Sequence, residues 1–477
     1  MRPLYRGPSI QKIIKRKKLK CGFRRTIRRI YMKKFFKAVA AVALGAVMTC
    51  GFAACGGNDG PGGTDSEGNK IVKIMVHVDE RSAEGKAYKQ RVDAFNVAYK
   101  EQKIKASITF KARTTGVGGY ESNITNKFNE GTLDDIIAFD APNCAAYADK
   151  HILYDISEIV PAETQSKFYS TSLNTYDGKL YGLPIQESSA GIYYNKSVFD
   201  AAGVAVPNCT VENPWTFEQF EAVCKQLKDN GQTPLDLQLY NAQDEMAPYL
   251  LYPFIYAAGG EFTSADGLTA TGYMNSEKTK SGFEFLKGLV EKGYTSKPEG
   301  PVGKTDFFDG NVAMFLSSGW TIPELDHSYP IKFPNRTTWG LLPYPMKEKK
   351  ASATGSWSFG ITNNGVTDKS AAKELLLWMT SPESSKVITD ATGMIPARTD
   401  VETNYAAGSP EDVLMKQLST TGKARPATVA YPNFSSCFCS VIYSFATQQT
   451  AATCNLTETL NSRTSELQSE MNKHSRH

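Results

Sequence analysis

Strand-like and helix-like segments alternate from residue 71 to residue 139, and this alternation restricts the fold more than any other part of the chain. Apolar runs and period-two alternation mark three strands, and apolar residues at helical spacing mark the two helices between them. In chain order these segments are 71–76, 83–101, 104–110, 120–130 and 135–139. Because each intervening helix returns the chain to the same edge of the sheet, the pattern predicts a parallel sheet in an α/β lobe.

Acidic residues stand just beyond two of these strands. His77-Val78-Asp79 follows the first strand, and Asp140-Ala141-Pro142 follows the third. Ligands of open α/β sheets lie beyond the carboxyl ends of the strands, so we expect both segments at a cleft. Asp79 and Asp140 are therefore candidate hydrogen-bond acceptors for a ligand, and helix capping is the alternative role for each.

The chain that follows residue 70 is too long for a single hydrophobic core. About 400 residues remain there, whereas single cores stop growing at roughly 250–300 residues. No segment of it approaches the ~18 uninterrupted apolar residues of a membrane span. We therefore expect two lobes and no internal span.

The basic balance of the chain is confined to its N-terminus. Residues 1–54 contain 15 of the 54 Lys and Arg residues and no Asp or Glu. The remaining residues carry 39 basic against 49 acidic side chains, a formal net charge of about −10. Because the basic segment is expected to be removed, net charge argues against a nucleic-acid partner.

The end of this segment has the composition of an export signal. Residues 32–37 (MKKFFK) are a positive n-region, and residues 38–54 are apolar and small. The sequence Gly51-Phe52-Ala53-Ala54-Cys55 resembles a bacterial lipobox, with Phe52 where such boxes usually carry Leu. The resemblance implies that Cys55 is diacylated and becomes the new N-terminus, and an ordinary secretory signal is the alternative. Residues 1–31 precede a complete signal, so we expect the natural start at Met32, with a cytosolic basic arm as the alternative.

A flexible tether is predicted after the lipobox. Residues 55–70 comprise the candidate lipid Cys and a Gly-rich polar segment that cannot bury a core. Two acyl chains suffice for stable anchoring. The predicted location is the outer face of the cytoplasmic membrane, with a globular head held above it.

The later cysteines leave two possibilities open, disulfides and buried free thiols. Six allow 15 disulfide connectivities, and no His stands near the Cys-Phe-Cys pair to suggest zinc. These residues are Cys144, Cys209, Cys224, Cys437, Cys439 and Cys454.

Residues 176–227 predict a chain crossing followed by a surface helix. The segment contains a turn at Asp177-Gly178, a polar patch at 186–189 and then a strand-like run. Thr216 is a suitable N-cap for a helix over 217–227, where apolar residues recur at helical spacing. Polar groups are thus expected between two strands.

The order GKLYGLP, YYNKSVFDAAG and PWTFEQF in this segment resembles the crossover region of family 1 extracellular solute-binding proteins. These are the sugar-capturing lipoproteins and periplasmic proteins of bacterial ABC importers, of which maltose-binding protein is the familiar member. Further similar motifs are GTLDDIIAFDAPNCAAYADKHILYDISEIV, residues 307–320, 339–345, 355–361 and 393–398. The resemblance implies a two-lobed α/β fold of the type II periplasmic-binding-protein class, with the ligand cleft between lobes joined by hinge crossings.

The same resemblance implies several ligand-binding residues. Tyr249 and Tyr252 match the aromatic positions that follow a Pro in the ligand-contacting helix, and Trp320 matches an aromatic that packs on a sugar face. Glu187 matches the carboxylate after the first crossing. Trp357 is a further candidate platform, because sugars lay their apolar C–H face on an aromatic ring. The carboxylate that precedes the stacking Tyr in maltose-binding protein is replaced here by Ala247 or shifted to Glu245.

The motifs also predict lobe boundaries. The N-terminal lobe is expected to comprise 71–183 and 344–396, and the C-terminal lobe 184–343 and 397–477. The lobes are expected to close by bending near three hinge segments, Leu183–Pro184, Leu341–Tyr344 and Pro396–Thr399.

The sequence contains none of the common catalytic signatures. GxSxG, HExxH, Walker and GxGxxG motifs are missing, and the five His residues are scattered. We therefore expect a protein that binds without catalysis and without metal or cofactor. The resemblance implies that it is a monomer that captures a carbohydrate, in particular an oligosaccharide, for the permease subunits of an ABC importer. The alternatives are a surface glycan-degrading or other hydrolytic lipoprotein, and a ligand-sensing protein for a non-sugar solute such as a polyamine, peptide or glycerol phosphate.

Overall fold

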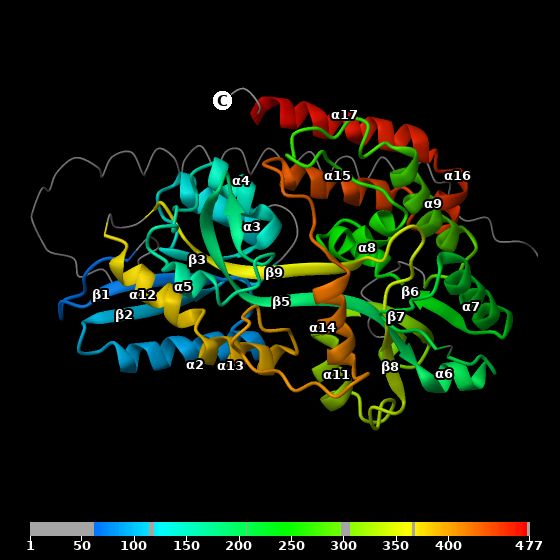
Figure 1. Ribbon diagram of the computed structural model, residues 1–477, viewed down its shortest axis with the longest axis horizontal. Coiled ribbons are helices and arrows are strands. Elements are labelled where there is room, and N and C mark those ends of the chain that lie inside the picture. The colour runs from blue at the N-terminus through cyan, green and yellow to red at the C-terminus, as the bar shows by residue number, and fades with distance from the viewer. Residues whose placement is uncertain (1–61, 114–118, 207, 297–305, 365–367, 475–477) are drawn as a thin grey trace, which may run out of the picture. The chain divides into compact units, whose positions relative to one another are not determined.

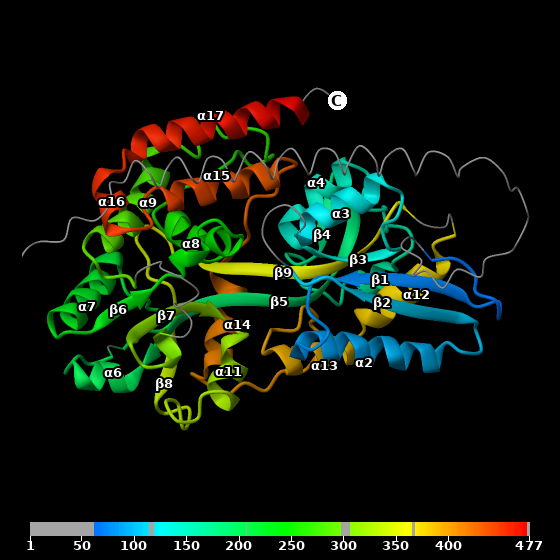
Figure 2. The same cartoon turned by 180° about the vertical axis from the view of Figure 1, so that it is seen from behind.

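The computed structural model describes residues 62–113, 119–206, 208–296, 306–364 and 368–474. The leader, the lipobox Cys55 and residues 56–61 of the predicted tether lie outside the described residues. Figure 1 shows the described part of the chain, coloured from the N-terminus to the C-terminus, and Figure 2 shows it from behind.

The first half of the described chain contains the following helices and strands. They are β1 (Lys70–Val76), α2 (Ala83–Ala98), β2 (Ile104–Phe110), α3 (Tyr120–Asn129), β3 (Ile136–Asp140), η1 (Ala141–Asn143), α4 (Cys144–Asp149), α5 (Ala162–Gln165), β4 (Asn174–Tyr176), β5 (Lys179–Asn195), α6 (Lys196–Ala201) and α7 (Phe217–Asp229).

The second half is richer in helices. Its elements are β6 (Thr233–Asp236), η2 (Leu239–Asn241), α8 (Met246–Ala257), α9 (Glu277–Glu291), β7 (Val312–Ser318), α11 (Thr321–His327), β8 (Trp339–Leu342), β9 (Ser352–Ile361), α12 (Ser370–Met379), α13 (Pro382–Thr392), α14 (Pro410–Thr420), β10 (Gly422–Lys423), α15 (Tyr431–Tyr443), α16 (Gln448–Thr453) and α17 (Leu456–His474).

The predicted alternation of strands and helices over residues 71–139 is confirmed. β1 pairs in parallel with both β2 and β3, as successive strands joined by helices should. Helix α2 begins after Ser82, whose side chain accepts a hydrogen bond from the Gly85 amide, and it buries apolar residues against the sheet. The α/β class expected from the sequence is therefore the observed one.

Two long strands, β5 and β9, connect the two ends of the molecule. Within the described residues the strand order is β2-β1-β3-β9-β5-β7-β6, with β4, β8 and β10 attached to this path. The first residues of β5 pair with β4, its middle pairs with β9, and its last residues pair with β7 and β8. Figures 1 and 2 show these arrows running between the blue strands β1 and β2 at one end and β6 and β7 at the other.

Each end of the sheet has its own hydrophobic core, and we call the two ends the first and second lobes. The first-lobe core includes Ile74, Val92 and Phe359, and the second-lobe core includes Leu250 and Phe434. Strand β5 contributes to both cores, because its early apolar residues belong to the first and its later ones to the second. The described structure is thus two-lobed with shared strands.

Two local predictions in the crossing segment are confirmed. Asp177 and Gly178 both have positive φ and join β4 to β5 in a tight hairpin. Thr216 caps α7, where its side chain accepts from the Gln219 amide while the Gln219 side chain accepts from the Thr216 amide. This capping box satisfies two amides that the helix itself leaves unpaired.

The second and third crossings lie later in the chain than predicted. Leu342 and Tyr344 belong to the second-lobe core, and the Tyr344 hydroxyl donates to the Leu250 carbonyl. The second crossing is therefore made by β9, not by Leu341–Tyr344. Arg398, from the segment predicted as the third crossing, donates to the Thr380 carbonyl at the end of α12 in the first lobe, so the chain leaves that lobe only after it.

The described cysteines are free thiols, which resolves the alternative left open by the sequence. They are Cys144, Cys209, Cys224, Cys437, Cys439 and Cys454. None of the helices in the described ranges is long and apolar enough to cross a membrane.

Candidate ligand-binding cleft

A cleft of about 600 Å³ lies between the two lobes, and we call it the central cleft. Its walls come from the ends of β1 and β3, the first turn of α2, the end of α13, the crossing strands β5 and β9, and the starts of α8 and α11. The volume lies within the range of about 300–1,000 Å³ that is typical of small-molecule sites.

The strand ends singled out from the sequence do meet at this cleft. His77 and Asp79, beyond β1, and Asp140, at the end of β3, all line it. This follows from the parallel pairing of β1 with β3, which brings their carboxyl ends to one edge. Asp79 forms an exposed ion pair with Arg81, with 2.9 Å between Oδ1 and Nε. Arg81 holds the pKa of Asp79 low, at about 2, so this carboxylate is an acceptor.

Alternation along the crossing strands divides their side chains between two cavities. Gln186 and Ser188 on β5 line the central cleft, whereas Glu187 lines a smaller cavity of about 220 Å³ on the other face. On β9, Trp357 lines the central cleft and Ser356 lines the smaller cavity. Because successive side chains of a strand point to opposite faces, Glu187 lies behind the cleft and not in it.

Glu187 is buried in this rear cavity. Hydrogen bonds from the Ser172 and Ser356 side chains lower the pKa of its carboxyl, but burial dominates and raises that pKa to about 7. Its backbone pairs with Ile395, with Glu187 N to Ile395 O at 2.7 Å. The structure therefore separates Glu187 from the other predicted residues, and we do not retain it as a ligand-binding residue.

Two aromatic rings form the second-lobe wall of the central cleft. The centroids of Tyr249 and Trp320 are 6.0 Å apart, and their planes are tilted by 35°. The Tyr249 hydroxyl donates to Ser188 Oγ at 2.8 Å and lies 3.2 Å from Ser318 Oγ. Gly355 lets the ring approach the crossing strands, because a Cβ there would lie 3.0 Å from the Tyr249 ring.

Trp357 lies on the first-lobe side of the cleft, and one of its faces is covered. The His77 imidazole stacks on the indole with centroids 3.4 Å apart and an interplanar angle of 2°. The Arg113 guanidinium lies 5.3 Å from the same ring. Burial and the nearby Arg113 charge hold the pKa of His77 well below its usual value, so the imidazole is neutral. Trp357 is thus a less accessible platform than Trp320.

Tyr252 does not line the central cleft. It is 2% exposed in the second-lobe core, and its ring packs against Tyr256 and Phe262. Helix α8 is apolar on nearly every face, so the spacing of its aromatics does not show which of them points to the cleft. We therefore exclude Tyr252 from the site.

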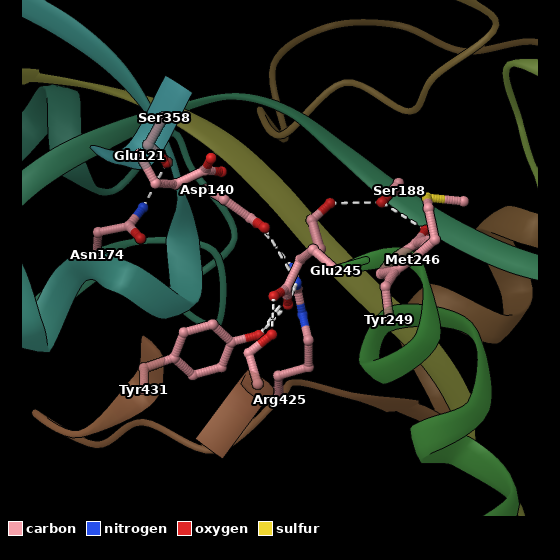
Figure 3. A network of polar contacts seen from close by, with 12 residues as sticks. Glu121, Asp140, Asn174, Ser188, Glu245, Met246, Tyr249, Ser358, Arg425 and Tyr431 are labelled. Atoms are coloured by element: carbon pink, nitrogen blue, oxygen red, sulfur yellow. Dashed lines mark hydrogen bonds and ion pairs between the residues drawn. The ribbon is translucent and has the colours of Figure 1, made fainter. Parts of the chain in front are cut away.

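A buried guanidinium joins the lobes at the base of the cleft (Figure 3). Arg425 binds both oxygens of Asp140, with Nη2 to Oδ1 at 2.7 Å and Nη1 to Oδ2 at 3.0 Å. The same guanidinium contacts Glu245 at the start of α8 and the Tyr431 hydroxyl. Arg113 extends the network, with Nη2 3.7 Å from Asp140 Oδ2. Opposite charges are thus matched inside the cleft.

A second polar group lies near the start of α2. Glu84 accepts a hydrogen bond from the Tyr88 hydroxyl at 2.5 Å and from Gln186 Nε2 at 3.3 Å. Burial raises the pKa of Glu84 to about 7. Gln186 in turn accepts from the Thr392 hydroxyl at 3.2 Å. These contacts hold the Gln186 amide in place at the cleft surface.

A comparison with known families identifies the family of the chain. A model of the bacterial extracellular solute-binding protein family matches residues 90–417. The chain belongs to this family.

Individual relatives of this solute-binding protein are distant but cover most of it. The maltooligosaccharide ABC transporter solute-binding lipoprotein of Streptococcus pneumoniae is 22% identical over 81% of this chain and 87% of the relative. The galactooligosaccharide-binding protein of Bacillus subtilis is 22% identical over 77% of this chain and 83% of the relative. The cyclic α-maltosyl-1,6-maltose binding protein of Arthrobacter globiformis superposes with a TM-score of 0.69 at 19% identity, covering 85% of this chain and all of that one. The last match shows a shared fold.

Several residues of the cleft were not singled out from the sequence. Arg425 and Arg113 line it, yet neither stands in a recognisable motif, and Gln186 was expected only as part of the polar patch at 186–189. Asp140 and Arg425 are 285 residues apart, so no local pattern could reveal their pairing. Within the described residues of this solute-binding protein no group of His, Cys, Asp and Glu could hold a metal ion.

Proposed function

We propose that this solute-binding protein captures a carbohydrate, in particular an oligosaccharide, in the central cleft and delivers it to the permease subunits of an ABC importer. In this proposal the protein binds and releases its ligand without chemical change. The observation that carries it is the placement of aromatic rings, the half-buried Trp320 and the buried Tyr249, on one wall of the cleft and hydrogen-bonding side chains on the other.

The chemistry of a sugar matches these two walls. A pyranose presents an apolar C–H face to an aromatic ring and hydroxyl groups around its edge. Trp320 and Tyr249 supply the platform, with Trp357 as a further aromatic surface. Asp79 and Asp140, predicted from the sequence, supply acceptors.

The charge pairing inside the cleft supports an uncharged ligand. Each of the two guanidinium groups that line it is already bound to carboxylates, Arg425 to Asp140 and Glu245, and Arg113 to Glu121. An acidic ligand would have to displace one of these carboxylates. A neutral ligand with many hydroxyls needs only hydrogen bonds.

Capture is proposed to proceed by closure of the lobes. In this proposal strands β5 and β9, which join the lobes, bend as the lobes close, so a ligand that contacts both walls favours the closed arrangement. The lobes are the N-terminal and C-terminal lobes predicted from the sequence, with the second and third crossings shifted as described above. A micromolar dissociation constant, about −8 kcal/mol, would permit both capture and release. The monomer would be held at the membrane by lipidated Cys55.

The first test is a thermal-shift screen of the protein from residue 56 with mono- and oligosaccharides, and with polyamines, phosphates and peptides alongside. A ligand at 100 times its dissociation constant adds about 2.7 kcal/mol to the unfolding free energy. We expect a sugar to raise the melting temperature and to be recovered unchanged. A hit confined to the other compounds, or hydrolysis of the sugar, would refute the proposal.

The Trp320→Ala variant tests the site itself. Loss of the platform should weaken sugar affinity at least tenfold, which corresponds to about 1.4 kcal/mol. The matched control is Tyr273→Ala, because Tyr273 is an exposed aromatic of the second lobe that does not line the central cleft. Equal affinities of the two variants would place the ligand elsewhere.

A further inference from the structure

Glu84 borders the central cleft with one oxygen of its carboxyl already occupied. It stands in the first turn of α2, and 18% of its side chain is exposed. Oε1 accepts hydrogen bonds from the Tyr88 hydroxyl at 2.5 Å and from Gln186 Nε2 at 3.3 Å, and His77 Nε2 lies 3.7 Å from it. No described residue donates a hydrogen bond to Oε2, so this is the oxygen left for a ligand.

The groups that contact Glu84 are neutral. Burial raises the pKa of Tyr88 well above its usual value and holds the pKa of His77 well below its own, so the phenol keeps its proton and the imidazole carries no charge. The third group, Gln186, is an amide. Among the described residues Glu84 forms no ion pair with Lys or Arg, and burial raises its own pKa to about 7. The neutral carboxylic acid is therefore well populated near neutral pH.

The charged groups on the neighbouring elements have partners of their own. Arg113, beyond β2, is bound to Glu121 with Nε to Oε1 at 2.8 Å, and Asp79, beyond β1, is bound to Arg81. An ionised Glu84 would therefore add a negative charge beside arginines that are already paired. The other charged groups of the cleft wall are Asp140, Glu245, Glu324 and Arg425. Helix α13 packs against α2, and its charged residues, each in an ion pair, are Glu383, Lys386 and Asp390.

A neutral carboxyl can donate a hydrogen bond as well as accept one. The carboxylates of Asp79 and Asp140, each paired with an arginine, can only accept. Sugar hydroxyls can donate to these carboxylates, whereas the ring and glycosidic oxygens of a sugar only accept. Glu84 adds a donor that such oxygens require.

We propose that Glu84 is a specificity-determining residue of the central cleft, which binds an acceptor oxygen of the sugar through the Oε2–H of its neutral carboxyl. The inference rests on the proposed function, because it names a contact of the same carbohydrate site. Its consequence is that protonation of Glu84 and binding of the sugar favour each other. Sugar affinity therefore falls as the pH rises above about 7. A cationic ligand would show the reverse, because it favours the ionised carboxylate.

Calorimetric titration with maltotriose at pH 6, 7 and 8.5 tests this contact, and the best sugar of the thermal-shift screen replaces maltotriose if maltotriose does not bind. We expect the affinity of the parent protein to fall about tenfold from the lowest to the highest pH, the size of one hydrogen bond. Glu84→Gln keeps an acceptor for Tyr88 and carries an amide donor that does not titrate. Its affinity should match that of the parent at pH 6 and stay constant at higher pH.

Two control variants separate Glu84 from other carboxyls. Glu374→Gln is the matched control, because Glu374 also accepts from a tyrosine, with Tyr99 Oη 3.0 Å from its Oε2, but does not line the cleft. Glu187→Gln removes the carboxyl of the rear cavity, whose pKa is also raised to about 7. Both controls should keep the fall in affinity of the parent. A fall that persists in Glu84→Gln, or that disappears in Glu187→Gln, would overturn the inference.

A measurement on the parent protein covers the case in which Glu84→Gln does not fold. Binding at pH 7.5 should take up protons, which appears as a binding enthalpy that depends on the ionisation enthalpy of the buffer. Sugar binding without proton uptake, or with an affinity that is constant or rises with pH, would refute the Glu84 contact and leave the proposed function standing. Failure of every sugar in the screen to bind would instead refute the proposed function, and the Glu84 contact with it.

Discussion

The two faces of the crossing strands differ more than their sequences suggest. One face presents Gln186, Ser188 and Trp357 to the central cleft, where aromatic and polar groups are open to a ligand. The other face presents Glu187 and Ser356 to a cavity about a third as large, where the carboxyl is already bound by hydroxyls. Neighbouring polar residues of one strand thus line two different cavities, and under the proposed function only those on the cleft face bind ligand.

The largest expected effect comes from Glu187 on the rear face, which should make the free energy of unfolding depend on pH. Burial raises the pKa of Glu187 to about 7 from its ordinary value of 4.5. The contribution of Glu187 to the free energy of unfolding is fully present below about pH 4.5. It is lost as the pH rises through about 7, because the carboxyl loses its proton at a lower pH in the unfolded protein than in the folded one. The loss should be roughly 3 kcal/mol.

Glu187→Gln removes this titration and keeps the shape of the side chain. Urea unfolding at pH 4.5, 6 and 8 should show the variant gaining on the parent protein as the pH rises. A constant difference between the two proteins across this range would show that Glu187 is not buried as described.

A smaller effect, on affinity, should separate the adjacent residues Gln186 and Glu187. Gln186→Ala removes an amide held at the cleft surface and should weaken sugar binding about tenfold, or about 1.4 kcal/mol. Glu187→Gln should leave affinity unchanged, because its side chain lies on the other face. Calorimetric titration measures the sugar affinity of both variants. A loss of affinity in Glu187→Gln but not in Gln186→Ala would show that the ligand binds on the Glu187 face.

The smallest effect is expected at Ser188, within the cleft face. Ser188→Ala removes the 2.8 Å bond to the Tyr249 hydroxyl, but Ser318 remains 3.2 Å from that hydroxyl. The free energy of unfolding should therefore fall by only about 1 kcal/mol, and affinity should fall by about threefold, which is roughly 0.7 kcal/mol. A loss as large as that of Gln186→Ala would indicate that Ser188 itself contacts the ligand.

The sequence was sufficient for those features that depend on local patterns. The strands and helices of the first lobe follow from periodicity, and the capping box at Thr216 follows from residue type and spacing. The same holds for the strand ends at Asp79 and Asp140, because parallel pairing sends them to one edge.

The features that could not be predicted correctly depend on register or on contacts between distant segments. Adjacent residues of a strand such as Gln186 and Glu187 point to opposite faces, but only the position of the lobes determines which of them meets the cleft. Tyr252 could not be distinguished from Tyr249 on a helix that is buried almost all round. No local sequence pattern indicated that Arg425 belongs to the cleft, since its partner Asp140 lies far away in the chain.

The position of β9 in the sheet has a consequence for biosynthesis. β9 pairs with β3, yet it is made more than 200 residues later. One edge of β3 therefore stays without its partner until most of the chain has been synthesised, and long-range pairing of this kind is slow to form. For a member of an extracellular family, this order delays completion of the first lobe and prolongs the unfolded state in which a polypeptide can be secreted.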